Sequence, residues 1–109
     1  MAYNQQLTER IRDLLKEKPG LSEKKMFGGI GFLTMGNMAC GVLNNDLIVR
    51  VGPENYNDSL KLPNTRPFDI TGRPMKGWVM VSSKGYQTNK DLDAWVERGV
   101  TFSLTLPAK

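Results

Sequence analysis

Apolar residues near the N-terminus recur at intervals of three and four, which is the period of an amphipathic helix. The spacing predicts a helix over residues 4–18. Asn4 is expected to cap it, because an asparagine side chain can accept a hydrogen bond from a free backbone N–H at the helix start. Pro19-Gly20 is expected to end it. The apolar stripe consists of Leu7, Ile11, Leu14 and Leu15.

Between residues 24 and 51 the period changes to two, which is typical of strands with one buried face. Gly36-Asn37 and Asn44-Asn45-Asp46 are tight-turn signals, because glycine and asparagine tolerate positive φ. Such short connections favour an antiparallel meander. The expected strands cover residues 30–35, 38–43 and 47–51.

The second half of the chain predicts two more helices and two more strands. Pro53 suits the first turn of a helix, and Thr88 is the expected cap of the last one. Pro67 cannot donate to a strand ladder, so its strand is expected at an edge of the sheet. Gly99 lies inside the last helix, where a close approach to the sheet would explain its presence. The expected elements are a short helix that starts at Pro53 and is closed by Leu62-Pro63, strands over 66–70 and 78–81, and a helix over 89–106.

The order αβββαββα predicts the α+β class. We expect a two-layer α/β sandwich in which the first and last helices cover one face of an antiparallel sheet. The length of 109 residues fits a single domain over residues 1–109. Trp78 and Trp95 each fit the apolar pattern of their own element, so both are expected in the core rather than stacked on bases.

The chain contains no histidine and a single cysteine, Cys40. Histidine is the most frequent general base and metal ligand, so Ser-His and Cys-His pairs and histidine-ligated zinc sites are excluded. Cys40 lies between apolar neighbours and is expected in the core. Gly28-Gly29-Ile30-Gly31 resembles a nucleotide-binding loop only weakly, because a strand rather than a helix is expected after it, and a bend or bulge is the simpler interpretation. We therefore expect no enzyme activity, catalytic residue, metal or cofactor.

No apolar run reaches the roughly 18 residues that span a bilayer. The N-terminal residues lack the basic start and apolar stretch of a signal peptide. The expected location is the cytoplasm, without a membrane partner.

Positive charge is concentrated in one segment. The chain has a net charge of +4, and residues 60–90 carry six basic residues against Asp69 alone, which is +5 for that segment. Clustered lysines and arginines bind phosphates through charge, although a solubilising surface is the favoured interpretation of these residues. The candidate nucleic-acid-binding residues are Lys24, Lys25, Arg50, Arg66, Arg73, Lys76 and Lys84.

A series of short motifs occurs in one order along nearly the whole chain, from residue 3 to about residue 107. They are Lys24-Lys25-Met26-Phe27-Gly28-Gly29, Gly36-Asn37-Met38-Ala39-Cys40-Gly41, Leu47-Ile48-Val49-Arg50-Val51-Gly52, Phe68-Asp69, Gly72-Arg73-Pro74-Met75 and Asp93-Ala94-Trp95-Val96. This series resembles the N-terminal domain of the TfoX/Sxy family of competence regulators. The resemblance implies a two-layer α/β domain of the kind also seen in secretion chaperones. It also implies a link to transcriptional control of DNA-uptake genes in bacteria, in regulators that carry a second, C-terminal helical domain.

Three classes of function follow. The first is a non-catalytic regulatory or adaptor domain that acts through protein contacts, with the transcription machinery as one candidate partner and a homodimer as another. The second is a weak, sequence-independent nucleic-acid-binding module that uses the basic segment. The third is an enzyme such as a methyltransferase, which the missing cofactor architecture and the absent histidine disfavour.

Overall fold

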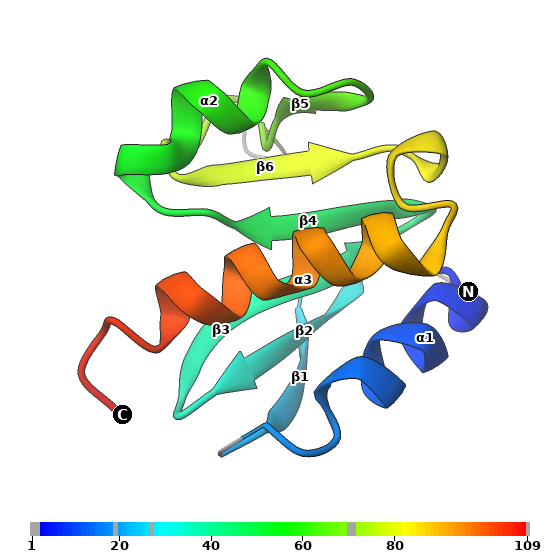
Figure 1. Cartoon of the computed structure of the whole chain (residues 1–109), viewed down its shortest axis with the longest axis vertical. Coiled ribbons are helices and arrows are strands. Elements are labelled where there is room, and N and C mark those ends of the chain that lie inside the picture. Colours follow the sequence, from blue (N-terminus) through cyan, green and yellow to red (C-terminus); the bar gives the residue numbers. More distant parts are fainter. Residues whose placement is uncertain (1–2, 19, 27, 70–71, 109) are drawn as a thin grey trace.

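Three helices pack against one face of a six-stranded antiparallel sheet in the part of the chain that the computed structural model describes, residues 3–18, 20–26, 28–69 and 72–108 (Figure 1). The strand order is β1-β2-β3-β4-β6-β5. The elements are α1 (Gln5–Leu15), β1 (Ser22–Met26), β2 (Gly29–Thr34), β3 (Asn37–Leu43), β4 (Asp46–Arg50), the 3₁₀ turn η1 (Pro53–Asn55), α2 (Tyr56–Leu60), β5 (Thr65–Pro67), β6 (Trp78–Val81), the 3₁₀ turn η2 (Ser83–Gly85) and α3 (Asn89–Ser103). The expected α+β class and antiparallel sheet are confirmed.

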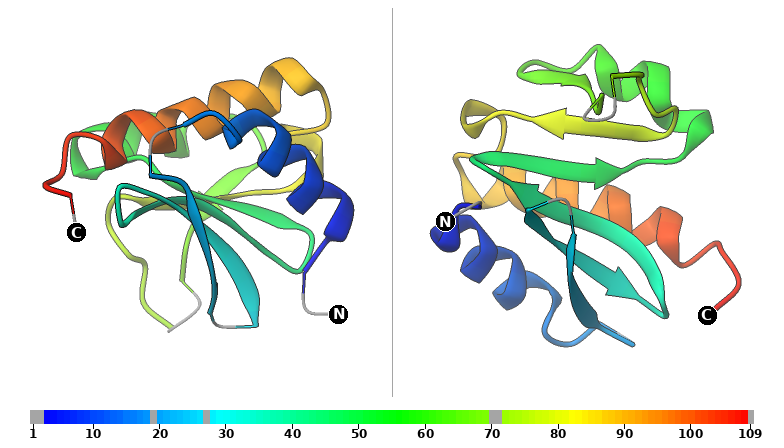
Figure 2. Two further views of the ribbon diagram at one scale, coloured as in Figure 1. Left: turned by 90° about the horizontal axis from the view of Figure 1, so that it is seen from below. Right: turned by 180° about the vertical axis from the view of Figure 1, so that it is seen from behind.

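The main core lies between the sheet and the helices α1 and α3, which lie on the same side of it (Figure 1 and Figure 2). Burying a leucine or valine side chain stabilises a fold by about 1.5–3 kcal/mol, so this layer is the main source of stability. Tyr56 and Leu60 of α2 pack against the same core, as their four-residue spacing predicts. The helices contribute Leu7, Ile11, Leu15, Leu92, Trp95, Val96 and Val100, and the strands contribute Ile30, Phe32, Cys40, Val42, Leu47, Val49, Val79 and Val81.

The structure contains one strand more than the expected order αβββαββα. Residues 22–26, Ser-Glu-Lys-Lys-Met, form β1, which pairs with β2 along its whole length. The pattern did not reveal this strand because its polar and charged residues do not alternate with apolar ones. It lies at an edge of the sheet, where exposed lysines discourage pairing with other chains.

Several predicted boundaries shift. The turn between β2 and β3 is Met35-Gly36, with φ of 52° and 83°, so Asn37 belongs to the strand rather than to the turn. Positive φ at both central residues is the type I′ geometry that matches the twist of a hairpin. α1 and α3 end at Leu15 and Ser103, three residues earlier than expected. β5 is an edge strand, as Pro67 indicates, but it is shorter than expected, and Ile70 and Thr71 lie outside the described residues.

Both predicted helix caps are present. The Asn4 side chain accepts a hydrogen bond from the Leu7 N–H at 2.9 Å, and Thr88 accepts one from the Asp91 N–H at 3.1 Å. No helix in the described ranges combines the length and the apolar character needed to cross a bilayer.

A charged contact joins the first helix to the edge strand. The Arg12 guanidinium of α1 donates from Nε and Nη2 to the two carboxylate oxygens of Glu23 in β1, each at 2.8 Å. Hydrogen bonding from Arg12 lowers the pKa of Glu23 below its ordinary value. The clamp fixes the position of β1 relative to α1.

Candidate interaction surfaces

A second apolar cluster lies on the face of the sheet that carries no helix. Side chains alternate along a strand, so Ile48 of β4 points away from the helices while its neighbours Leu47 and Val49 point toward them. Ile48, Phe68 and Met80 are buried together. When one face of an antiparallel sheet packs on the core, the other face usually carries polar residues and contacts water. A large apolar cluster on that second face must be covered by the chain itself or by a partner.

The connection between β5 and β6 folds over this cluster. Phe68 N–H donates to the Trp78 carbonyl at 3.4 Å, and Met75 N–H donates to the Phe68 carbonyl at 3.0 Å. The far end is held by Gly77, whose carbonyl accepts from the N–H groups of Val51 and Gly52 at 2.8 and 3.0 Å. Figure 2 (left) shows this connection and the β1–β2 hairpin extending from the sheet on the side opposite the helices. Backbone hydrogen bonds therefore hold Phe68 and Met75 next to each other and tie Gly77 to the end of β4.

A pocket of about 240 Å³ opens on this face, and we call it the sheet-face pocket. Trp78 is half-buried at its wall, with its ring centroid 6.1 Å from that of Phe68. Met75 is 37% exposed and borders the opening. The lining is almost wholly apolar, so the pocket suits an apolar group. The lining residues are Gly29, Ile30, Met38, Val42, Leu43, Ile48, Phe68, Met75 and Trp78.

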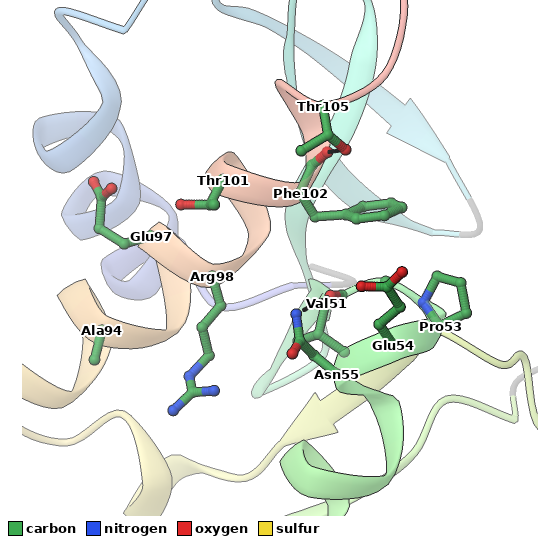
Figure 3. Close-up of a pocket in the computed structure, with 11 residues that line it drawn as sticks. Val51, Pro53, Glu54, Asn55, Ala94, Glu97, Arg98, Thr101, Phe102 and Thr105 are labelled. Atoms are coloured by element: carbon green, nitrogen blue, oxygen red, sulfur yellow. Dashed lines mark hydrogen bonds between the residues drawn. The ribbon is translucent and has the colours of Figure 1, made fainter.

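A second concavity, the α3 groove, runs between α3 and η1 and has a volume of about 740 Å³ (Figure 3). Phe102 lies against Gly52, where a Cβ atom would stand 2.4 Å from the ring, and φ of 87° also favours glycine there. Glu97 bonds to Lys18 at 2.9 Å, and the Arg98 guanidinium stacks on Trp95. The polar groups of the groove therefore carry both signs of charge.

Arg50 connects the two surfaces. Its guanidinium carbon lies 5.2 Å from the ring centroid of Trp78 and 5.3 Å from that of Phe102. Cation–π contacts of this kind are worth about 0.5–2 kcal/mol. Arg50 is thus held between an aromatic side chain of the sheet-face pocket and one of the α3 groove.

The other predicted basic residues do not form one patch. Lys24 and Lys25 are exposed on β1, at the sheet edge opposite β5. Arg66 on β5 is bonded to Asp46 at 2.7 Å, which neutralises its charge locally. The structure distributes the predicted set over both edges of the sheet.

Arg73, Lys76 and Lys84 flank β6 at its two ends. Arg73 and Lys76 are exposed in the β5–β6 connection, on either side of Met75. Lys84 is exposed in η2, beyond the other end of the strand, where it lines a shallow recess next to α3. Of these three residues, Arg73 and Lys76 are the ones that lie next to Met75, which borders the sheet-face pocket.

The remaining sequence candidates have structural roles. Cys40 is fully buried, and burial raises the pKa of its thiol to about 12. Gly28 lies in the β1–β2 hairpin, as the bend interpretation predicts, with φ of 78°. Trp95 is in the main core as expected, whereas Trp78 is half-buried and packs against the second apolar cluster on the opposite face. In the described part of the chain, no three His, Cys, Asp or Glu side chains come together as metal ligands.

Comparison with protein families places these surfaces in context. The family model described as the TfoX N-terminal domain matches residues 13–103, which is most of the chain. The chain belongs to the TfoX N-terminal domain family. No curated protein and no solved structure gives a significant match.

The TfoX N-terminal match begins within α1 and ends at the last residue of α3, so it includes all six described strands. Both the sheet-face pocket and most of the α3 groove therefore lie in the part of the chain that defines the family. Membership of this family indicates that the domain is related to competence regulators.

The sequence did not predict the sheet-face pocket. Phe68, Met75 and Trp78 come together only because the β5–β6 connection folds back over β4 and β6. The available signal was Ile48 and Met80, two large apolar residues at strand positions that alternation assigns to the face without helices.

Proposed function

We propose that this TfoX N-terminal domain is a non-catalytic regulatory or adaptor domain of the bacterial cytoplasm that acts through protein contacts. The observation that carries the proposal is the apolar cluster on the helix-free face of the sheet, with Ile48, Phe68 and Met80 beneath an opening bordered by Met75. Concave apolar sites with exposed aromatic or methionine side chains are typical of binding surfaces. Membership of a family of competence regulators supports a role in transcriptional control.

The chemistry of the chain supports a role without catalysis. With no histidine in the sequence, the one thiol has no imidazole partner, and its raised pKa keeps it protonated at neutral pH. The pocket lining offers apolar contact rather than acid–base groups.

The test combines transcript levels with a contact probe in the bacterium that carries the gene. Deleting the gene is expected to change a defined set of transcripts, and the wild-type gene is expected to restore them. A photo-crosslinking amino acid at position 75 is expected to capture a protein, whereas the same group at position 13, which is exposed on α1, is not. Unchanged transcripts together with equal crosslinking at both positions would contradict the proposal.

The second candidate function is weak, sequence-independent binding of nucleic acid. The exposure of Arg73 and Lys76 in an ordered loop favours it. Such binding would have an affinity of roughly 10⁻⁴–10⁻⁶ M at physiological salt. Anisotropy of a labelled DNA duplex at several salt concentrations tests it, and replacing both residues with alanine should lower the slope of log K against log salt by about two.

A further inference from the structure

We propose that the sheet-face pocket binds an acidic segment of a protein partner. One large apolar side chain of that segment enters the pocket between Phe68, Met75 and Trp78, and carboxylates on either side of it pair with the basic rim. This proposal rests on the proposed function, because it gives the chemistry of the partner that the regulatory domain contacts.

The pocket fits one apolar side chain. Its volume of about 240 Å³ exceeds the roughly 150 Å³ of an engineered cavity that binds benzene, so a leucine, phenylalanine or tryptophan side chain can be accommodated. Half-buried Trp78 and exposed Met75 provide aromatic and adaptable contact surface at the opening. Apolar anchors in pockets of this kind dominate the binding energy of many interfaces.

Basic residues adjoin two of the residues that line the pocket, Met75 and Trp78. Arg73 and Lys76 are exposed on either side of Met75, and Arg50 lies over Trp78. One acidic residue, Asp69, lies in the same loop. Asp46 of β4 is bonded to Arg66, so its charge is already balanced.

Charge complementarity selects the occupant. A rim with an excess of cations attracts acidic segments and accelerates their association. The α3 groove lacks this bias, because Glu54 and Glu97 accompany Arg98 along its wall.

A peptide display selection on the purified domain tests the proposal without an assumed partner. The library consists of random 12-residue peptides, selected at about 50 mM salt. The selected peptides are expected to share one aromatic or leucine residue flanked by aspartate or glutamate. Absence of enrichment, or enrichment of basic or uncharged peptides, would overturn the proposal.

Charge-matched variants locate the binding site of one selected, fluorescein-labelled peptide. Arg73→Glu with Lys76→Glu is expected to weaken binding by about tenfold or more, because two attractive charges become repulsive. Lys16→Glu with Lys90→Glu changes the net charge equally at two exposed positions, the C-cap of α1 and the first turn of α3, and a change of less than about twofold is expected. Equal weakening by the two pairs would overturn the assignment of the rim.

Three further measurements separate the other occupants. Met75→Glu should abolish peptide binding while Thr101→Arg in the α3 groove should not, and the reverse pattern would overturn the proposal. If a DNA duplex competes for the pocket and binds more tightly than every selected peptide, the proposal is overturned and nucleic acid is the occupant. If analytical ultracentrifugation shows a dimer that Met75→Glu dissociates, the proposal is overturned and a second copy of the chain is the occupant.

These results are distinguishable from failure of the proposed function. Peptide binding with unchanged transcripts in the deletion strain would support the pocket and contradict the regulatory role. Changed transcripts without peptide enrichment would support the role and overturn the pocket assignment.

Discussion

Gly99 of α3 lies so close to Ala39 of β3 that a Cβ atom at position 99 would stand 2.1 Å from the Ala39 carbonyl oxygen. No side chain fits in that space without moving the helix or the strand. The close approach brings Trp95 and Val96 of the same helix into the core, where both are buried. Gly99 therefore sets the spacing between the helix layer and the sheet.

Replacing Gly99 with alanine is expected to destabilise the domain. Alanine improves helix propensity by about 1 kcal/mol, but forcing a methyl group into a packed contact costs about 1–3 kcal/mol, so a net loss is predicted. Urea unfolding followed by circular dichroism measures the change. Ala94→Gly, at an exposed position of α3, reports the propensity effect alone. A Gly99→Ala variant more stable than the wild type would show that the helix shifts freely.

The two tryptophans are expected to differ in their contribution to stability. Trp95 is buried in the main core, so Trp95→Ala should lower the free energy of unfolding by about 3–5 kcal/mol. Because Trp78 is half-buried, Trp78→Ala should lower the free energy of unfolding by less. Thermal unfolding of both variants compares them, and equal losses would contradict the assignment of Trp78 to an open pocket wall.

The Arg12–Glu23 clamp predicts a dependence of stability on pH. The pKa of Glu23 is lowered in the folded state, so its contribution is present above its ordinary pKa of 4.5 and is lost as the pH falls through the lower folded value. Both side chains are about one-third exposed, so the contribution is expected to be below about 1 kcal/mol. Glu23→Gln should lower the free energy of unfolding at pH 7, and this effect should become smaller as the pH falls below 4.5. Glu17→Gln, at an exposed position of the turn after α1, is the control and should have little effect at either pH.

Cys40 is expected to be unreactive in the folded domain. With a thiol pKa of about 12, roughly one thiol in 10⁴ is ionised at pH 8, and the side chain is fully buried. Labelling with a chromogenic disulfide should therefore be slow in native buffer and fast in guanidinium chloride. Complete native labelling within minutes would contradict a purely structural role.

Sequence periodicity predicted most of the fold because the main core is one-sided. The apolar residues of α1 form one buried stripe, and the caps Asn4 and Thr88 mark the starts of α1 and α3. The strand β1 escaped prediction because an edge strand needs backbone pairing rather than apolar side chains. The turn at Met35-Gly36 was shifted by one residue, since a methionine with positive φ is rare and is adopted here only because the hairpin requires it.

The candidate surface was harder to predict than the fold. Arg73 and Lys76 were identified from charge alone, and their neighbour Met75 in the pocket rim was not. Arg66 looked available until the structure placed Asp46 beside it. Contacts between residues far apart in sequence decide which charges are neutralised and which apolar residues share a pocket, and periodicity carries no information about them.

The two indole N–H signals in a nitrogen-15 NMR spectrum test the central claim most directly, because the chain has only two tryptophans. Trp78 lines the sheet-face pocket, whereas Trp95 is buried beneath α3 on the other side of the sheet. Spectra are recorded while a selected acidic peptide is added, and Trp78→Phe assigns the signals. A partner-binding role for this face predicts that the Trp78 signal shifts in proportion to binding while the Trp95 signal stays in place. A shift of Trp95 with an unchanged Trp78 would contradict it.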